Sequence, residues 1–134
     1  MIKKVDHIAI AVENLEEEIN KYQNLLGLTL SGTEVVPGQK VKTALFVSGD
    51  IHIELLEPLG EDSPISNFLA RRGGGIHHIA FEVEDIQKTF RILQQNRVGV
   101  LGSKPVEGAG GSRVVFLKPK EFSNVLIELV EKSG

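Results

Sequence analysis

Residues 5–14 of the chain, VDHIAIAVEN, combine a short alternating strand pattern with the start of a helix. Residues 76–85, IHHIAFEVED, repeat this stretch 71 positions later, so that His7 corresponds to His78 and Glu13 to Glu84. In both copies a histidine stands among small and apolar residues on a segment with strand periodicity. The repeat indicates that the chain contains two related modules, each of which contributes one histidine to a common site.

The composition is that of an ordinary globular protein. The chain has 134 residues, of which 41% are hydrophobic and 25% are charged. Its net charge of -3 gives no reason to expect nucleic acid or an anionic membrane as a partner. The lack of cysteine excludes disulfides, thiolate metal ligands and a cysteine nucleophile. We find no segment with the apolar length of a signal peptide or a membrane span, and we expect a cytoplasmic protein.

Periodicity and turn residues predict the same order of elements twice: a strand, a helix and three further strands. Asn14 and Asp85 are expected to cap the two longer helices, and Ser63 a short helix between the modules. The first helix is expected to bury Leu15, Ile19, Tyr22 and Leu26. Strands are expected at residues 3–12, 28–36, 41–47 and 51–57, and again near residues 76–83, 99–101, 113–117 and 125–130.

The last strand of each module supplies a glutamate. Residues 53–57, IELLE, recur as residues 127–131, IELVE, at an offset of 74, so that Glu54 corresponds to Glu128. The change from 71 to 74 predicts an insertion in the second module, in the loop 107–112 or the turn 118–124. A carboxylate among apolar neighbours is costly to bury unless it is paired or binds a metal.

Two imidazoles and two carboxylates from corresponding strands suit a divalent first-row metal ion. The candidate ligands are His7, Glu54, His78 and Glu128. A single strand histidine or glutamate is more often a structural residue, but the recurrence of both in one repeat favours the metal site. We interpret His77 as structural or as a neighbour of the ligands, and His52 as a residue on the solvent side or near the rim.

We therefore predict an α+β fold in which two βαβββ modules in tandem form a cupped, eight-stranded mixed sheet around a metal site. Residues 1–134 would form a single domain, with module one at about 1–57, a linker helix at about 58–75 and module two at about 76–134.

These residues resemble the vicinal oxygen chelate superfamily (glyoxalase/bleomycin resistance/dioxygenase), whose members pair βαβββ modules around a metal. A closer resemblance, over nearly the whole chain, is to the methylmalonyl-CoA epimerase family. The motifs that carry it are DHIA at 6–9, ELLEP at 54–58 followed by DSPI at 62–65, GIHHIA at 75–80, GSRVVFLKPK at 111–120 and VLIEL at 125–129. The second and fourth of these are the more specific ones.

The resemblance implies metal-dependent epimerisation of methylmalonyl-CoA, in which the R and S forms interconvert by removal of the proton alpha to the thioester through a metal-stabilised enolate. It implies His7, Glu54, His78 and Glu128 as metal ligands and Glu128 as a catalytic base as well. Relatives often carry glutamine at the position of Glu54, and a second catalytic glutamate where this chain has Thr43. Because threonine is no base at neutral pH, our hypothesis is that Glu54 is both a ligand and the second base.

The resemblance also implies a cobalt ion, an acyl-CoA substrate and a homodimer. Nitrogen and oxygen ligands equally admit manganese, nickel, zinc or iron(II). The candidate substrate contacts are Gly111, Ser112, Arg113, Lys118 and Lys120. Two alternative functions stay open: a glyoxalase I-type lactoylglutathione lyase, which the carboxylate of Glu54 slightly favours, and a non-catalytic small-molecule-binding module of the same fold.

Overall fold

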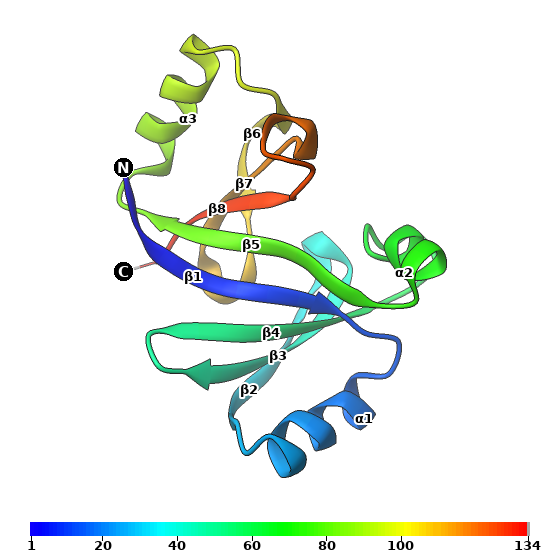
Figure 1. Ribbon diagram of the computed structural model, residues 1–134. Helices are drawn as coiled ribbons and strands as arrows, with labels where there is room; N and C mark the ends of the chain where they lie inside the picture. Colours follow the sequence, from blue (N-terminus) through cyan, green and yellow to red (C-terminus); the bar gives the residue numbers. More distant parts are fainter. Residues whose placement is uncertain (134) are drawn as a thin grey trace. The chain divides into compact units, whose positions relative to one another are not determined.

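The computed structural model describes residues 1–133 and contains eight strands and three α-helices within them (Figure 1). The first module comprises β1 (Ile2–Ala11), α1 (Leu15–Asn20), β2 (Thr29–Val36), β3 (Val41–Ser48) and β4 (Ile51–Pro58). The connecting helix is α2 (Ser66–Arg72). The second module comprises β5 (Gly75–Val83), α3 (Ile86–Gln95), β6 (Val100–Glu107), β7 (Arg113–Leu117) and β8 (Ile127–Glu131). Within these residues no helix is long and apolar enough to cross a membrane.

The chain divides into two compact units: residues 7–77, and residues 1–6 together with the chain from His78 onward. In the first unit the strand order is β2-β3-β4-β1, and β1 runs parallel to β4. In the second the order is β6-β7-β8-β5, and β5 runs parallel to β8. All other pairings within the two units that we describe are antiparallel. The predicted α+β fold of mixed strands in two tandem βαβββ modules is confirmed.

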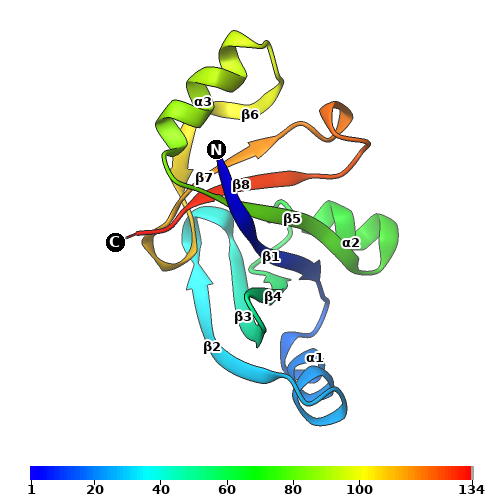
Figure 2. The same ribbon diagram turned by 60° about the vertical axis from the view of Figure 1, so that its left-hand side comes forward.

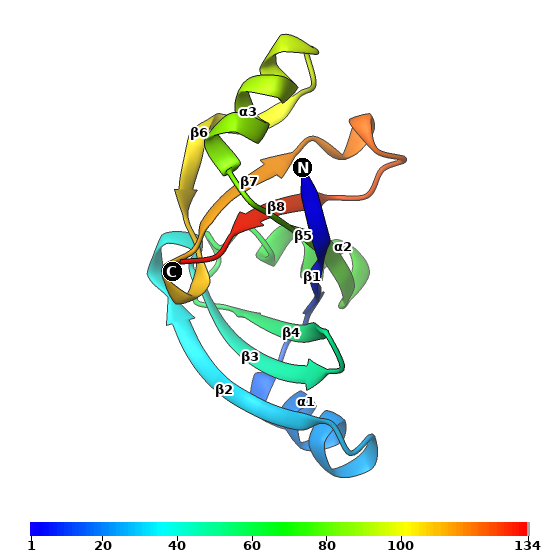
Figure 3. The same ribbon diagram turned by 90° about the vertical axis from the view of Figure 1, so that its left-hand side faces the viewer.

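The strands of residues 7–77 have two chemically different faces, because successive side chains point to opposite sides. One face carries Val12, Phe46 and Leu55, which pack against Leu15 of α1 in the hydrophobic core. Figure 3 shows α1 beside β3 and β4. The opposite face carries a polar group among small and apolar side chains; its members are His7, Ala9, Ala11, Thr43, Glu54 and Leu56, all buried.

The second unit repeats this division. Ile86 and Phe90 of α3 pack against Val83, Val115, Leu117 and Leu129 on one face, and Figure 2 shows α3 near β6 and β7. The opposite face carries His78, Ala80, Val114, Phe116, Glu128 and Val130. The helix therefore occupies one face of each module, and the candidate ligands occupy the other.

Two local predictions are wrong. The first helix changes at Lys21 into a π-helical turn (Lys21–Leu25), closed by a hydrogen bond of 3.2 Å from the Leu26 N–H to the Lys21 carbonyl. The wider turn rotates Leu26 outward, where it is 67% exposed, and Leu28 joins the core instead. In addition, α2 begins after Ile65, and Ser63 forms a turn before it through a 3.0 Å bond from the Ser66 N–H to the Ser63 carbonyl.

The strand registers locate the insertion in the second module. Leu45 of β3 faces Glu54 of β4, and Phe116 of β7 faces Glu128 of β8. Leu45 precedes its partner by nine residues and Phe116 by twelve. The three additional residues therefore lie in the connection between β7 and β8, the second of the two predicted places.

Candidate functional site

The first unit contains a buried histidine–glutamate pair. His7 lies on β1 and Glu54 on the parallel strand β4, where Glu54 faces Ala9 in the register. The His7 Nε2 atom is 3.5 Å from Glu54 Oε1, and both residues are 7% exposed. Because Ala9 has only a methyl side chain, the imidazole two residues before it reaches along the strand to the carboxylate. The two candidate donors of the first unit therefore lie next to each other.

The second unit contains the corresponding pair. His78 lies on β5, and Glu128 on the parallel strand β8 faces Ala80. His78 Nε2 is 2.9 Å from Glu128 Oε1, and both residues are 5% exposed. Phe116 of β7 faces Glu128 of β8 in the register. The Phe116 ring meets the His78 imidazole edge-on, with ring centroids 5.4 Å apart. The aromatic edge restrains the imidazole beside the carboxylate.

The surroundings of these glutamates are unusual for carboxylates. Ala80, Val114 and Val130 form a buried cluster on the face that carries Glu128. An ionised carboxylate removed from water needs a compensating charge or several hydrogen bonds. Imidazole nitrogens and carboxylate oxygens are also the donors that divalent first-row metals bind. The donor sets His7 with Glu54 and His78 with Glu128 therefore fit the predicted metal.

His52 lies close to the first pair. It faces His7 in the register of β1 and β4, and its partial exposure agrees with the expected place near the rim. Strand alternation puts it on the same face as Glu54, two residues away. The sequence interpretation missed the contact of Phe116 with His78, since that contact depends on the β7–β8 register.

A second pair of repeated carboxylates has a structural role. Glu57 Oε2 accepts a 2.8 Å hydrogen bond from the N–H of Leu15, the first residue of α1. Glu131 Oε1 accepts a 2.9 Å bond from the N–H of Ile86, the first residue of α3. A helix leaves its first N–H groups without internal partners, and a carboxylate there also meets the positive end of the helix dipole. Each carboxylate thus ties the last strand of its module to the start of the helix.

The candidate substrate contacts lie on several surfaces of the second unit. Ser112 is buried, and its hydroxyl donates to the Ala109 carbonyl at 2.8 Å. Arg113 is exposed and lies on the α3 side of β7, where its guanidinium is close to the side-chain amide of Gln87. Gly111 has a φ of 76°, which favours glycine. Lys118 and Lys120 are both exposed, and the methylenes of Lys118 lie against Gly99.

Thr43 occupies the position for which the resemblance predicts a second catalytic glutamate. It is 5% exposed, faces Leu56 across β4 and lies on the same face as Glu54. Its hydroxyl donates to the Glu34 carbonyl at 3.3 Å, a long and weak hydrogen bond. The corresponding residue of the second unit is Val114, which faces Val130. Thr43 therefore contributes volume and a satisfied hydroxyl to this face, and no basic group.

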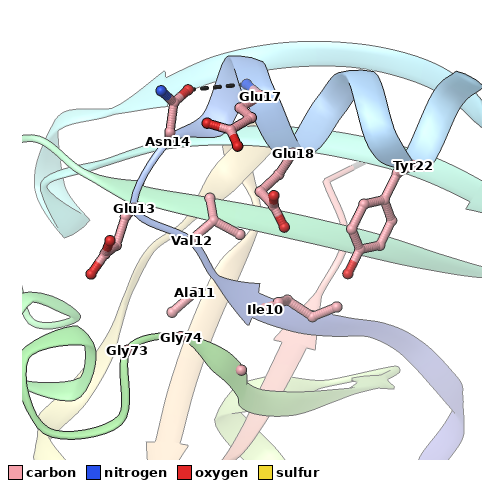
Figure 4. A pocket seen from close by; sticks show the side chains of 11 residues that line it. Ile10, Ala11, Val12, Glu13, Asn14, Glu17, Glu18, Tyr22, Gly73 and Gly74 are labelled. Carbon is pink, nitrogen blue, oxygen red and sulfur yellow. Dashed lines mark hydrogen bonds between the residues drawn. The ribbon is translucent and has the colours of Figure 1, made fainter. Parts of the chain in front are cut away.

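A pocket of about 440 Å³ lies on the helix side of the first unit, away from the candidate ligands (Figure 4). Its lining includes residues 10–14, Glu18 and Tyr22 of the first helix, and the glycines 73–75. A side chain at Gly74 would meet the Ala11 carbonyl at 3.2 Å, which explains a glycine there. Burial, and secondarily the charge of Glu18, raise the pKa of the Tyr22 phenol above its usual value.

Known proteins provide an independent view of the chain. Residues 6–116 match the profile of the Glyoxalase/Bleomycin resistance protein/Dioxygenase superfamily. The chain is 44% identical over 131 residues to the ethylmalonyl-CoA/methylmalonyl-CoA epimerase of Cereibacter sphaeroides, covering 96% of this chain and 98% of that protein.

Solved structures extend the likeness to the fold. Methylmalonyl-CoA epimerase of Mycobacterium tuberculosis superposes with a TM-score of 0.95 at 35% identity, over 99% of this chain and 90% of the other. A variant of the Streptomyces coelicolor methylmalonyl-CoA epimerase, in complex with 2-nitronate-propionyl-CoA, superposes with a TM-score of 0.93 at 35% identity, over the full length of both chains. The predicted family and the prediction of an isomerase are confirmed. The chain belongs to the Glyoxalase/Bleomycin resistance protein/Dioxygenase superfamily and, within it, to the methylmalonyl-CoA epimerase family.

Proposed function

We propose that the protein interconverts the R and S forms of methylmalonyl-CoA with the help of a divalent metal ion. The observation that carries this proposal is the duplicated pair of buried histidine and glutamate, at His7 with Glu54 and at His78 with Glu128. The epimerisation removes the proton between a thioester and a carboxylate, and then returns a proton to the other face of the same carbon. Such a reaction needs a stabilised enolate and two proton-transfer groups.

We propose that His7, Glu54, His78 and Glu128 hold one ion. Each unit contributes one imidazole and one carboxylate to this set, and Glu128 is the repeat counterpart of Glu54. The family resemblance suggests cobalt, while the donor chemistry also admits manganese, nickel, zinc and iron(II). When bound, the ion supplies Lewis-acid stabilisation of the negative charge that develops on the thioester oxygen. The buried and largely apolar surroundings of the glutamates would strengthen that stabilisation by excluding water.

Glu128 and Glu54 are the proposed proton-transfer groups. Each is a buried carboxylate beside an imidazole, and each comes from the corresponding strand of a repeated module. Two equivalent carboxylates from a duplicated fold are suited to opposite faces of one planar enolate, which epimerisation requires. Thr43 carries no carboxylate, and Glu34, which faces it from β2, is exposed. Glu54 would therefore serve both as a ligand and as the second base.

The glyoxalase I-type alternative rests on one observation, the carboxylate of Glu54. Such an enzyme would use the same four residues for proton transfer in a glutathione hemithioacetal and form lactoylglutathione. The identity to epimerases over nearly the whole chain supports the epimerase instead. A homodimer and a cytoplasmic location stay predictions.

Deuterium uptake from solvent tests the proposal. The protein is stripped of metal with a chelator, reloaded separately with each of the five ions, and given R- or S-methylmalonyl-CoA in deuterium oxide. We expect metal-dependent exchange with both epimers. Metal-dependent formation of lactoylglutathione without exchange into methylmalonyl-CoA would establish the alternative.

The role of Glu54 needs a variant. With saturating metal, Glu54→Gln is expected to reduce exchange of one epimer by about 10²-fold or more and to leave the other much less affected, because only one face loses its base. Metal content measured on the same samples separates loss of the ligand from loss of the base. The exposed Glu13→Gln is the matched control. Equal exchange of both epimers in Glu54→Gln would refute the second-base role.

A further inference from the structure

Three side chains near the end of α2 form a small stack of cationic and aromatic groups, which we call the Phe68 stack. The guanidinium carbon of Arg72 lies 5.1 Å from the ring centroid of Phe68, over its face. The His77 ring meets Phe68 edge-on, with centroids 5.1 Å apart and an interplanar angle of 81°. All three residues belong to the unit of residues 7–77. In Figure 1, α2 leads directly into the start of β5, which carries His77.

The stack is separate from the contacts that anchor α2. Ile65 and Leu69 are the buried residues of this segment, at 2% and 8% exposure, and the Gly73 N–H closes the helix on the Leu69 carbonyl at 2.7 Å. Phe68 is only partly buried and Arg72 is exposed. The core contact of α2 is therefore complete without the Phe68 stack, and this leaves an ordered aromatic and cationic surface at the edge of the unit.

The charge of Arg72 is also uncompensated. Among residues 1–133 no carboxylate forms an ion pair with Arg72 or with its neighbour Arg71. Both cations stabilise the last turn of α2, because they lie near the negative end of the helix dipole. That stabilisation needs no aromatic partner. A guanidinium held over a ring is, in addition, a planar group on which a nucleobase stacks, and its N–H groups bind phosphate.

We propose that the Phe68 stack binds the nucleotide end of the acyl-CoA substrate, with the adenine ring stacked on Arg72 and Phe68 and a phosphate group bound by the guanidinium. This inference rests on the proposed function, because it supplies the acyl-CoA. Coenzyme A carries an adenine ring and several phosphates far from the reacting carbon. A site for that end would hold substrate without touching the chemistry, so its loss raises KM and leaves kcat unchanged.

Two thioesters of methylmalonate separate this role from catalysis and from folding. Methylmalonyl-CoA has the nucleotide, whereas methylmalonyl-pantetheine lacks it. Arg72→Gln and Phe68→Leu are compared with Arg71→Gln, which removes the same charge from the same turn without a ring beneath it. For Arg72→Gln we expect KM for methylmalonyl-CoA to rise about tenfold, the scale of one base-stacking contact, with kcat and the kinetics of methylmalonyl-pantetheine unchanged.

Phe68→Leu is expected to raise the same KM by a smaller factor, and Arg71→Gln to change it less than about twofold. Adenosine 3′,5′-bisphosphate should inhibit the wild type competitively with methylmalonyl-CoA and lose that inhibition in Arg72→Gln. Equal effects of Arg72→Gln on the two thioesters, or equal effects of Arg71→Gln and Arg72→Gln, would overturn the inference. Inhibition by the bisphosphate that is not competitive would overturn it too, since that result indicates a separate nucleotide site. No turnover of either thioester by the wild type would instead refute the proposed function.

Discussion

The two modules share a topology and a set of polar residues, but they differ in what surrounds those residues. Asn14 and Asp85 accept hydrogen bonds from the N–H groups of Glu17 and Lys88 at 3.0 and 3.1 Å, so both longer helices begin with the same cap. The carboxylates of Glu57 and Glu131 hold the first residue of each helix. Both modules therefore have side-chain oxygens that accept hydrogen bonds from the free N–H groups at the start of the helix.

The faces opposite the helices have diverged. Thr43 and Leu45 of the first module correspond in register to Val114 and Phe116 of the second. His7 and Glu54 lie 3.5 Å apart, and His78 and Glu128 lie 2.9 Å apart beside the Phe116 ring. The second module therefore packs an aromatic ring against its pair, while the first keeps the Thr43 hydroxyl and the partly exposed His52 near its pair. We therefore expect the two glutamates to differ in catalytic role.

The largest effect is expected from Glu128→Gln. The amide keeps the shape of the side chain but cannot accept the substrate proton, so turnover in both directions should fall by about 10³-fold. Circular dichroism and metal content should be measured beside the rate, because a folded, metal-loaded and inactive variant isolates the proton transfer. The exposed Glu84→Gln is the control from the same unit. Retention of more than about a tenth of the activity would exclude Glu128 as the base. It would also contradict the expectation that the two glutamates differ in catalytic role with Glu128 as the more important one.

Much of this comparison was visible in the sequence. The alternation of β1 and β5, the two helix caps and the matching glutamates are local patterns or repeats, so the order of elements and the two polar pairs could be predicted. The Glu57–Leu15 bond joins residues 42 positions apart and depends on how the last strand meets the helix. The π-helical turn that exposes Leu26 is a departure from helical periodicity that residue types do not signal. The metal ligation of the two pairs stays a prediction.

The two helix-start carboxylates give a test of equivalence. Glu57→Ala and Glu131→Ala each leave a helix N–H without its acceptor, and each is expected to lower the free energy of unfolding by about 1–2 kcal/mol. Urea denaturation of both variants at neutral pH measures the effect. Similar losses would support an equal structural role in the two modules. A loss in only one variant would show that water replaces the carboxylate at the other helix start.

A reciprocal exchange tests the diverged faces. Val114→Thr puts a hydroxyl among Ala80, Val130 and Phe116, and it should lower the free energy of unfolding by about 1 kcal/mol. Thr43→Val removes only the weak bond to the Glu34 carbonyl, and its effect should stay below about 0.5 kcal/mol. The same urea titration measures both variants. If Val114→Thr does not change the free energy of unfolding, the new hydroxyl donates to a backbone carbonyl as that of Thr43 does. The two faces would then be more alike than their residues suggest.

The smallest effect concerns Tyr22, which corresponds to the apolar Leu93 of α3 in the repeat. Burial, and then the charge of Glu18, raise the pKa of its phenol in the folded protein. The folded state therefore holds this proton to higher pH than the unfolded chain, so the contribution to stability is complete below the usual tyrosine pKa and is lost as pH rises through the folded value.

Because the chain has one tyrosine and no tryptophan, the near-ultraviolet absorbance of tyrosinate reports this residue alone. Glu18→Gln should lower the pKa of Tyr22 and still leave it above that of an exposed tyrosine, since burial is the larger cause. Glu17→Gln is the matched control, because Glu17 lies one position away and does not raise the pKa of this phenol. A Tyr22 pKa in Glu18→Gln equal to that of a free tyrosine would mean that charge outweighs burial. The first helix would then cover its sheet less completely than α3 covers its own.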